Sequence, residues 1–357
     1  MTSENVVILA GRRALSIIRD EGLSSDRVAV VAGAAGGPKW LVLHHLDRQL
    51  FGRWFSRRTR PLHLVGSSIG SWRFSAAAQT NPVPAMDRFL TAYLNQRYSD
   101  SPTTDEVSGE MLKILDGYLD DDGALGLLNH PVYRLNVLAV RCRRSVTSEA
   151  GVLLGLGLAG AALANAASRR LLRLFFERIL LYDSRQPPPF YNMDGFPIHR
   201  TALSEHNLRQ GLMASGSIPL VMAGVRDIPG APPGMYRDGG LIDYHPDLPY
   251  LDGGDELVLF PHYTDRIIPG WLDKRLPWRK PDRTNMDRVV LVAPSRSLLA
   301  GLPMGKIADR NDFYRFKGDD AGRLKYWGAV VEAGRKMADS FMELVESGRI
   351  RDHVRPL

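Results

Sequence analysis

Cysteine is almost absent from this chain of 357 residues, which contains a single one, Cys142. A single cysteine excludes an intrachain disulfide and every metal site built from several thiolates, and it favours a reducing compartment. A signal peptide is not indicated either, because the apolar run from Val6 to Ala10 is too short and no basic residue precedes it. We therefore expect a cytoplasmic protein that is not secreted.

Lysine is scarce as well, since only eight of the 46 basic residues are lysine, while the formal net charge is +7. The arginines form clusters at residues 57–60, 141–144 and 169–173. No helix-turn-helix or RNA-recognition pattern accompanies these clusters, so we expect no nucleic-acid partner. A solvated basic surface is the simplest interpretation of the clusters, and anionic lipid headgroups are the best specific one.

Long apolar runs are limited to one stretch, residues 150–167, which is near the lower length limit for a membrane span. Its many glycines and alanines, and Asn165, argue against a span. Between residues 169 and 179, arginines alternate with apolar residues, which would suit a helix lying in a membrane interface. Two interpretations follow: peripheral membrane contact through residues 150–182, or a core helix followed by an amphipathic surface helix.

Short β-branched runs separated by longer helical patterns indicate an α/β protein, and the chain is long enough for a large buried core. Residues 27–32 have the composition of a strand buried on both faces, and residues 62–65 supply another. Ser204 is a suitable N-cap for a following helix. The other expected strands are 133–141, 197–202, 256–261 and 288–293, and the expected helices are 4–20, 41–54, 69–78, 85–97, 104–119, 204–215 and 323–347.

The apolar run that begins at Leu62 ends in the pattern G-x-S-x-G, formed by Gly66, Ser68 and Gly70. A serine in this pattern sits on a tight strand-to-helix turn that exposes its hydroxyl above the sheet. Small flanking residues are needed there because Cβ atoms would collide. The sequence therefore makes Ser68 a candidate nucleophile, although a plain turn would have the same composition.

A glycine-rich loop, GAAGGPK, lies between the first expected buried strand and the next helix. A Walker A loop would need glycine in place of Pro38, and the dinucleotide-binding pattern would need glycine in place of Ala35, so both phosphate-binding interpretations fail. What remains is a pair of small residues, Gly36 and Gly37, whose backbone N–H groups can face an open space at the start of a helix. These are the properties of an oxyanion hole.

These motifs, in this order, resemble those of the patatin-like phospholipase family. The family pattern is a Gly-Gly-x-Arg/Lys loop, G-x-S-x-G, a segment of the type A-S-x-x-x-P, and D-G-G/A. The resemblance covers roughly residues 28–250, and its matching residues are Gly36, Gly37, Lys39, Gly66, Ser68, Gly70, Ala214, Ser215, Pro219, Asp238, Gly239 and Gly240. The departures from the pattern are Ala34, Ala35 and Trp40 in the loop, and Tyr244, His245 and Pro246 after D-G-G.

The resemblance implies a three-layer αβα fold with a mainly parallel central sheet. Because no break in composition separates its parts, we expect residues 1–357 to form a single domain. Its core would comprise residues 28–250, and the strands and long helix of residues 255–350 would complete it.

The resemblance also implies a serine acyl hydrolase that cleaves lipid esters, of the phospholipase A or lysophospholipase type. Ser68 would attack the ester carbonyl, and Asp238 would accept its proton without the help of a histidine. The backbone N–H groups of Gly36, Gly37 and Ile69 would hold the oxyanion. The substrate would be a lipid ester, and we expect no metal and no other cofactor.

Two alternatives remain open at this point. Ser68, Asp238 and either His245 or His262 follow the chain order of the Ser-Asp-His triad in α/β-hydrolases. A protein of a different class, without catalytic activity, could keep the same fold and bind membrane lipids. Labelling by a fluorophosphonate probe would separate this second alternative from a hydrolase, because the probe reacts with activated serines.

Overall fold

The structure is a computed structural model that describes residues 4–357. Within that range, one mixed sheet contains the strands β1 (Val6–Ala10), β2 (Val28–Gly33), β3 (Leu62–Ser67), β4 (Tyr133–Cys142), β5 (Phe176–Tyr182), β6 (Ile198–Ala202), β7 (Val225–Arg226), β8 (Met235–Asp238), β9 (Leu257–Pro261), β10 (Val289–Pro294) and β11 (Arg355–Pro356). Their order is β11-β1-β10-β9-β2-β3-β4-β5-β6, while β8 pairs with β4 and β7 with β8. Neighbouring strands from β10 to β4 are parallel, whereas β1 and β5 run antiparallel to β10 and β4.

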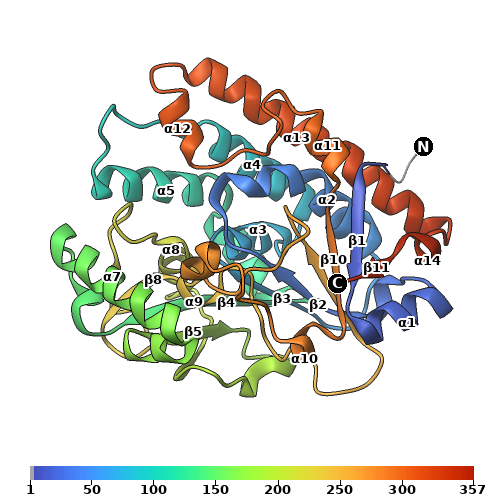
Figure 1. Cartoon of the computed structure of the whole chain (residues 1–357), viewed down its shortest axis with the longest axis horizontal. Helices are drawn as coiled ribbons and strands as arrows, with labels where there is room; N and C mark the ends of the chain where they lie inside the picture. Colours follow the sequence, from blue (N-terminus) through green and yellow to red (C-terminus); the bar gives the residue numbers. More distant parts are fainter. Residues whose placement is uncertain (1–3) are drawn as a thin grey trace.

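Helices flank this sheet, so the protein has the three-layer α/β architecture that the resemblance implied. Figure 1 shows α13 along the top of the molecule and α1 at the lower right, with the sheet between them. The α-helices are α1 (Arg12–Glu21), α2 (His44–Gln49), α3 (Ile69–Ala77), α4 (Pro82–Leu94), α5 (Thr104–Tyr118), α6 (Asp121–Asn129), α7 (Gly151–Ala167), α8 (Leu208–Gly216), α9 (Gly240–Asp243), α10 (Arg283–Met286), α11 (Arg296–Ala300), α12 (Asn311–Arg315), α13 (Asp320–Glu346) and α14 (Ile350–His353). Shorter or irregular helical segments include η3 (Gly37–Leu43), η4 (Leu50–Trp54), η6 (Arg169–Leu174) and η8 (Trp271–Arg275).

The central strands β2, β3, β9 and β10 are buried along their whole length. Their runs of valine, leucine and alanine explain this, because a parallel strand covered by helices on both faces has no polar face. The predicted strands at 27–32 and 62–65 are therefore confirmed. The sheet places the ends of β3 and β8 beside each other, since both strands pair with β4.

Two predicted helices are wrong, because both contain strands. Residues 6–10 form β1, which pairs with β10 and β11, and the helix in this region begins only at Arg12 and ends at Glu21. Residues 176–182 form β5, a buried strand between β4 and β6, and not an amphipathic surface helix. In both places apolar residues occur at spacings that fit either structure, and pairing with a distant strand decides between them.

Helix α7 is not the core helix of the simpler interpretation, because much of its apolar surface is exposed. The segment proposed for membrane contact is also too long, since its last part is the buried strand β5. Within residues 4–357, no helix is both long and apolar enough to cross a bilayer. Ser204 is not an N-cap either: α8 begins later, after Asn207, whose side-chain oxygen accepts a hydrogen bond from the Ser204 N–H.

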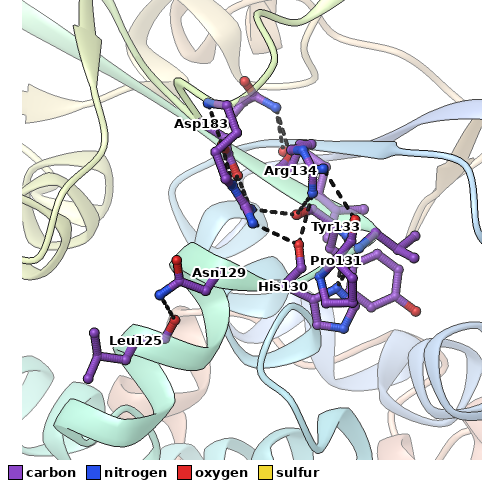
Figure 2. A network of polar contacts seen from close by, with 11 residues as sticks. Leu125, Asn129, His130, Pro131, Tyr133, Arg134 and Asp183 are labelled. Atoms are coloured by element: carbon purple, nitrogen blue, oxygen red, sulfur yellow. Dashed lines mark hydrogen bonds and ion pairs between the residues drawn. The ribbon is translucent and has the colours of Figure 1, made fainter.

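A polar network fixes the turn between α6 and β4 (Figure 2). The Arg134 guanidinium donates hydrogen bonds to the carbonyls of His130 and Tyr133, at 2.9 and 3.1 Å. The guanidinium of Arg185, which also pairs with Asp183, donates to the same His130 carbonyl. Backbone oxygens left open by the turn are thereby satisfied, and β4 enters the sheet in a fixed register.

Candidate active site

Ser68 lies on the turn between β3 and α3, and its backbone is strained. Its φ of 55° is in the left-handed region, which side chains other than glycine seldom adopt. The turn also brings α3 close to the sheet: a Cβ on Gly66 would lie 2.4 Å from the Gly70 carbonyl carbon, and a Cβ on Gly70 would lie 2.4 Å from the Gly33 oxygen. The glycines of G-x-S-x-G are therefore required by this close approach, as the sequence predicted.

The Ser68 hydroxyl donates a hydrogen bond to Asp238, with 2.7 Å between Oγ and Oδ2. Asp238 is the last residue of β8, and its other oxygen accepts a hydrogen bond from the Gly240 N–H at 2.7 Å. Both side chains are buried. Gly239 allows the turn because a Cβ there would lie 2.3 Å from the Leu138 carbonyl oxygen. The structure thus brings the two predicted catalytic residues into direct contact.

The environment of Asp238 keeps its carboxylate able to accept a proton. Burial raises the pKa of Asp238 from its ordinary value of 3.8 to about 6, while the hydrogen bonds from Ser68 and Gly240 act in the opposite direction. Arg310 and Lys274 lower the pKa more weakly, from a distance. Asp238 forms no ion pair with a basic residue anywhere in the described chain. A pKa near the working pH is what a general base needs.

Ser215, at the end of α8, holds this turn in place. Its hydroxyl accepts a hydrogen bond from the Ser68 N–H at 2.9 Å and donates to the Leu138 carbonyl at 2.6 Å. It also lies 2.7 Å from the Ser71 hydroxyl. Sequence reasoning placed Ser215 in a matching motif but assigned it no role. In this structure the residue connects α8, β4 and the start of α3.

The glycine loop lies on the same side of Ser68 as Asp238. Gly36, Gly37 and Lys39 line a cavity of about 190 Å³ together with Ser68 and Asp238. Gly37 has a φ of 55° and begins η3, and Ile69 begins α3. Backbone N–H groups in the first turn of a helix have no acceptor within that helix, so such groups are suited to hold an anion.

A second cavity, of about 490 Å³, also reaches Ser68 and is mainly apolar. Its lining includes Ile69 and Trp72 of α3, Met111 of α5 and Phe313 of α12. The two cavities share Gly37, Ser68, Ile218, Arg310 and Asn311. Ser68 therefore stands at the junction of a small polar space and a larger apolar one.

The histidines of the triad alternative are engaged elsewhere. His245 Nδ1 accepts a hydrogen bond from the Ile268 N–H, and its Nε2 lies 2.9 Å from the Tyr263 hydroxyl. His262 Nδ1 accepts a hydrogen bond from the Thr264 N–H. Within residues 4–357, neither ring is hydrogen-bonded to Ser68 or Asp238. This arrangement gives no support to a Ser-Asp-His triad.

A known protein family matches more than half of this chain. The sequence model of the patatin-like phospholipases matches residues 41–254, a range that includes Ser68 and Asp238 but begins after the glycine loop. A search of curated proteins finds no match. Because the matched range is more than half of the chain, this protein belongs to the patatin-like phospholipase family, and this membership implies a lipid acyl hydrolase activity.

Proposed function

We propose that the protein hydrolyses lipid esters through a Ser68–Asp238 dyad. The observation that carries this proposal is the 2.7 Å hydrogen bond from Ser68 Oγ to Asp238 Oδ2, on a strained turn that faces two cavities. Strain at a residue in such a position is typical of functional sites. Family membership supports the substrate class, and the raised pKa of Asp238 supports its role as a base.

The first half of the reaction forms an acyl-enzyme. Ser68 Oγ attacks the carbonyl carbon of the ester while its proton moves to Asp238 Oδ2. The carbonyl oxygen becomes an oxyanion. When the bond between the carbonyl carbon and the alcohol oxygen breaks, Asp238 returns the proton to the departing alcohol.

The second half releases the fatty acid. A water molecule enters, gives a proton to Asp238 and attacks the acyl carbon. The ester bond to Ser68 Oγ then breaks, and Asp238 returns the proton to this oxygen. The enzyme is restored without a metal or another cofactor.

The oxyanion would be held by backbone N–H groups of Gly36, Gly37 and Ile69. Support comes from their positions at the starts of η3 and α3, beside the cavities that Ser68 faces. The Ser68 N–H itself is not available, because it donates to Ser215. Each donor of this kind is worth about 10² to 10³ in rate in known enzymes.

Fluorophosphonate labelling tests the proposal directly, because the probe attaches to activated serines. We expect the wild-type protein to be labelled and Ser68→Ala to remain unlabelled. A matched control is Ser75→Ala, because Ser75 is a buried serine of α3 whose hydroxyl contacts Trp72 and Tyr118. A screen of lipid classes should then show ester hydrolysis that Ser68→Ala loses. No labelling, or equal labelling of Ser68→Ala, would instead favour the non-catalytic lipid-binding protein.

Peripheral membrane contact is a further part of this proposal, now limited to α7. Val152, Leu153, Leu156 and Leu163 are exposed and follow one face of this helix, which lies at the outer left of Figure 1. Glu149, just before α7, accepts a hydrogen bond at 3.3 Å from the N–H of Gly224, which lies two residues after Met222 of the larger cavity. An apolar helix face near arginine-rich η6 suits an anionic bilayer surface.

Sedimentation with anionic lipid vesicles tests this contact. We expect the double variant Leu153→Asp, Leu156→Asp to lose vesicle binding, because it places charges on the inserting face. Leu125→Asp is a suitable control, since Leu125 is an exposed leucine on α6. Unchanged binding of the double variant would contradict a docking role for α7.

A further inference from the structure

Three basic side chains line the small cavity beside Ser68. Lys39 belongs to η3, Lys274 to η8, and Arg310 directly precedes α12. Within residues 4–357, none of the three forms an ion pair with an acidic side chain, although arginines elsewhere in this range do so repeatedly. Separate segments of the chain therefore bring unpaired positive charge to one place.

The two lysines contact aromatic side chains. Lys39 Nζ lies 3.4 Å from the Tyr244 hydroxyl and 5.1 Å from the centre of the Tyr263 ring. Lys274 Nζ lies 4.0 Å from the centre of the Tyr244 ring. Contacts with ring faces hold an ammonium group in position but leave its positive charge in place.

The acidic residues of the cavity do not neutralise this charge. Asp309 lines the cavity, but its carboxylate pairs with Lys306 and accepts a hydrogen bond from the Asn311 N–H. Asp238 is hydrogen-bonded to Ser68. Burial alone would raise the pKa of Tyr244, but Lys39 and Lys274, together with hydrogen bonding to Tyr263, outweigh burial and the net shift of the pKa is downward.

The position of this cavity defines which part of a substrate would enter it. The cavity meets the apolar one at Ser68, so an ester bound there places one half on each side. The acyl chain suits the larger apolar cavity. The alcohol half must then enter the smaller one, whose volume of about 190 Å³ limits it to a compact group.

We propose that Lys39, Lys274 and Arg310 form a subsite for a phosphate group on the alcohol half of the ester. This inference rests on the proposed function, which it makes more specific. Preferred substrates are acyl esters that carry a phosphate close to the scissile bond and no cationic group attached to that phosphate. Lys39, Lys274 and Arg310 all lie outside the range matched by the family model, so the match itself does not predict this subsite.

Paired substrates test the subsite. We expect wild-type kcat/KM for a 1-acyl-glycerol 3-phosphate to exceed that for the monoacylglycerol with the same chain by tenfold or more. Lys274→Gln and Arg310→Gln should each reduce this ratio by about ten- to a hundredfold, as the loss of a charge-assisted contact does. Lys280→Gln is the matched control, because this exposed lysine lines neither cavity and its loss should leave the ratio as in the wild type. A ratio that neither cavity variant changes, or a wild-type preference for the uncharged ester, would overturn the subsite.

A binding measurement keeps this result separate from the proposed function. Ether analogues of the two lipids cannot be hydrolysed, so calorimetry with them reports the subsite even if no ester is cleaved. We expect the phosphate-bearing ether to bind more tightly than the uncharged one, and Lys274→Gln to remove the difference. Equal binding of the two ethers would contradict the proposal. Inorganic phosphate that binds as tightly as the phosphate-bearing ether would also contradict it, because the site would then serve free phosphate.

Discussion

Two buried aspartates, Asp238 and Asp243, lie close together in the chain but have opposite surroundings. Asp243 receives two hydrogen bonds from the Arg178 guanidinium, both at 2.7 Å. Asp238 receives one from a hydroxyl and one from a backbone N–H. A guanidinium supplies a full positive charge beside the carboxylate, whereas a hydroxyl and an amide supply hydrogen bonds without one. The difference separates a structural aspartate from one suited to catalysis.

A second buried arginine–carboxylate pair has the same geometry. Asp47 of α2 accepts hydrogen bonds from Arg73 of α3 at 2.8 and 2.7 Å, and both residues are buried. This pair connects the helix that follows the glycine loop to the helix that follows Ser68. Bidentate arginine–carboxylate pairs therefore hold the elements around the site, while the carboxylate inside it has no cationic partner among the described residues.

The largest effect should come from Asp238→Asn. This change keeps the shape of the side chain but removes the group that accepts the Ser68 proton, so we expect kcat to fall by about 10² to 10⁴. The free energy of unfolding should change little or increase, because a buried carboxylate without a cation is lost. Ester hydrolysis measures the change in kcat, and chemical denaturation measures the change in the free energy of unfolding. His245→Asn is the comparison variant: an equal loss of kcat there, with an intact fold, would revive the triad.

Asp243→Asn should have the opposite effects, a loss of stability and little change in the reactivity of Ser68. Here the Arg178 guanidinium stays buried without its carboxylate, which costs about 3 to 5 kcal/mol in known proteins. We expect chemical denaturation to show this loss, and the remaining folded protein to keep Ser68 labelling. Glu332→Gln breaks the exposed pair with Arg335 and should cost no more than about 1 kcal/mol. Equal losses of unfolding free energy in the two variants would show that burial does not make the Arg178–Asp243 pair more important for stability than the exposed one.

Much of the site could be predicted because its chemistry is local. G-x-S-x-G and D-G-G are short patterns in which close backbone approach requires glycine, and the structure shows these approaches at Gly66, Gly70 and Gly239. The residues that the sequence did not reveal act across long distances in the chain. The role of Ser215 depends on contacts with Ser68 and Leu138, and no local sequence pattern predicts these contacts.

The fold also has parts that the sequence predicts and parts that it does not. The apolar runs of β2 and β3 are buried on both faces, so composition alone identified them. The strands β1 and β5 were missed because their apolar spacing also fits a helix, and only pairing with β10 or β4 selects the strand. Similarly, no pattern marks Arg178 as the partner of Asp243. Tertiary contacts determine these features, and such contacts cannot be identified from a single sequence.

The last and smallest expected effect is the pH dependence that Asp238 gives to activity and to stability. Asp238 must be ionised to act as a base, so kcat/KM should rise with pH up to a pKa of about 6 and then level off. Stability should change in the opposite direction. Because the folded-state pKa is raised above its ordinary value, the folded protein holds the proton more tightly, and stability falls by on the order of 3 kcal/mol as pH increases from about 4 to about 6. The difference in unfolding free energy between wild type and Asp238→Asn, measured across this range, isolates the effect, and a difference that does not vary with pH would rule out the raised pKa.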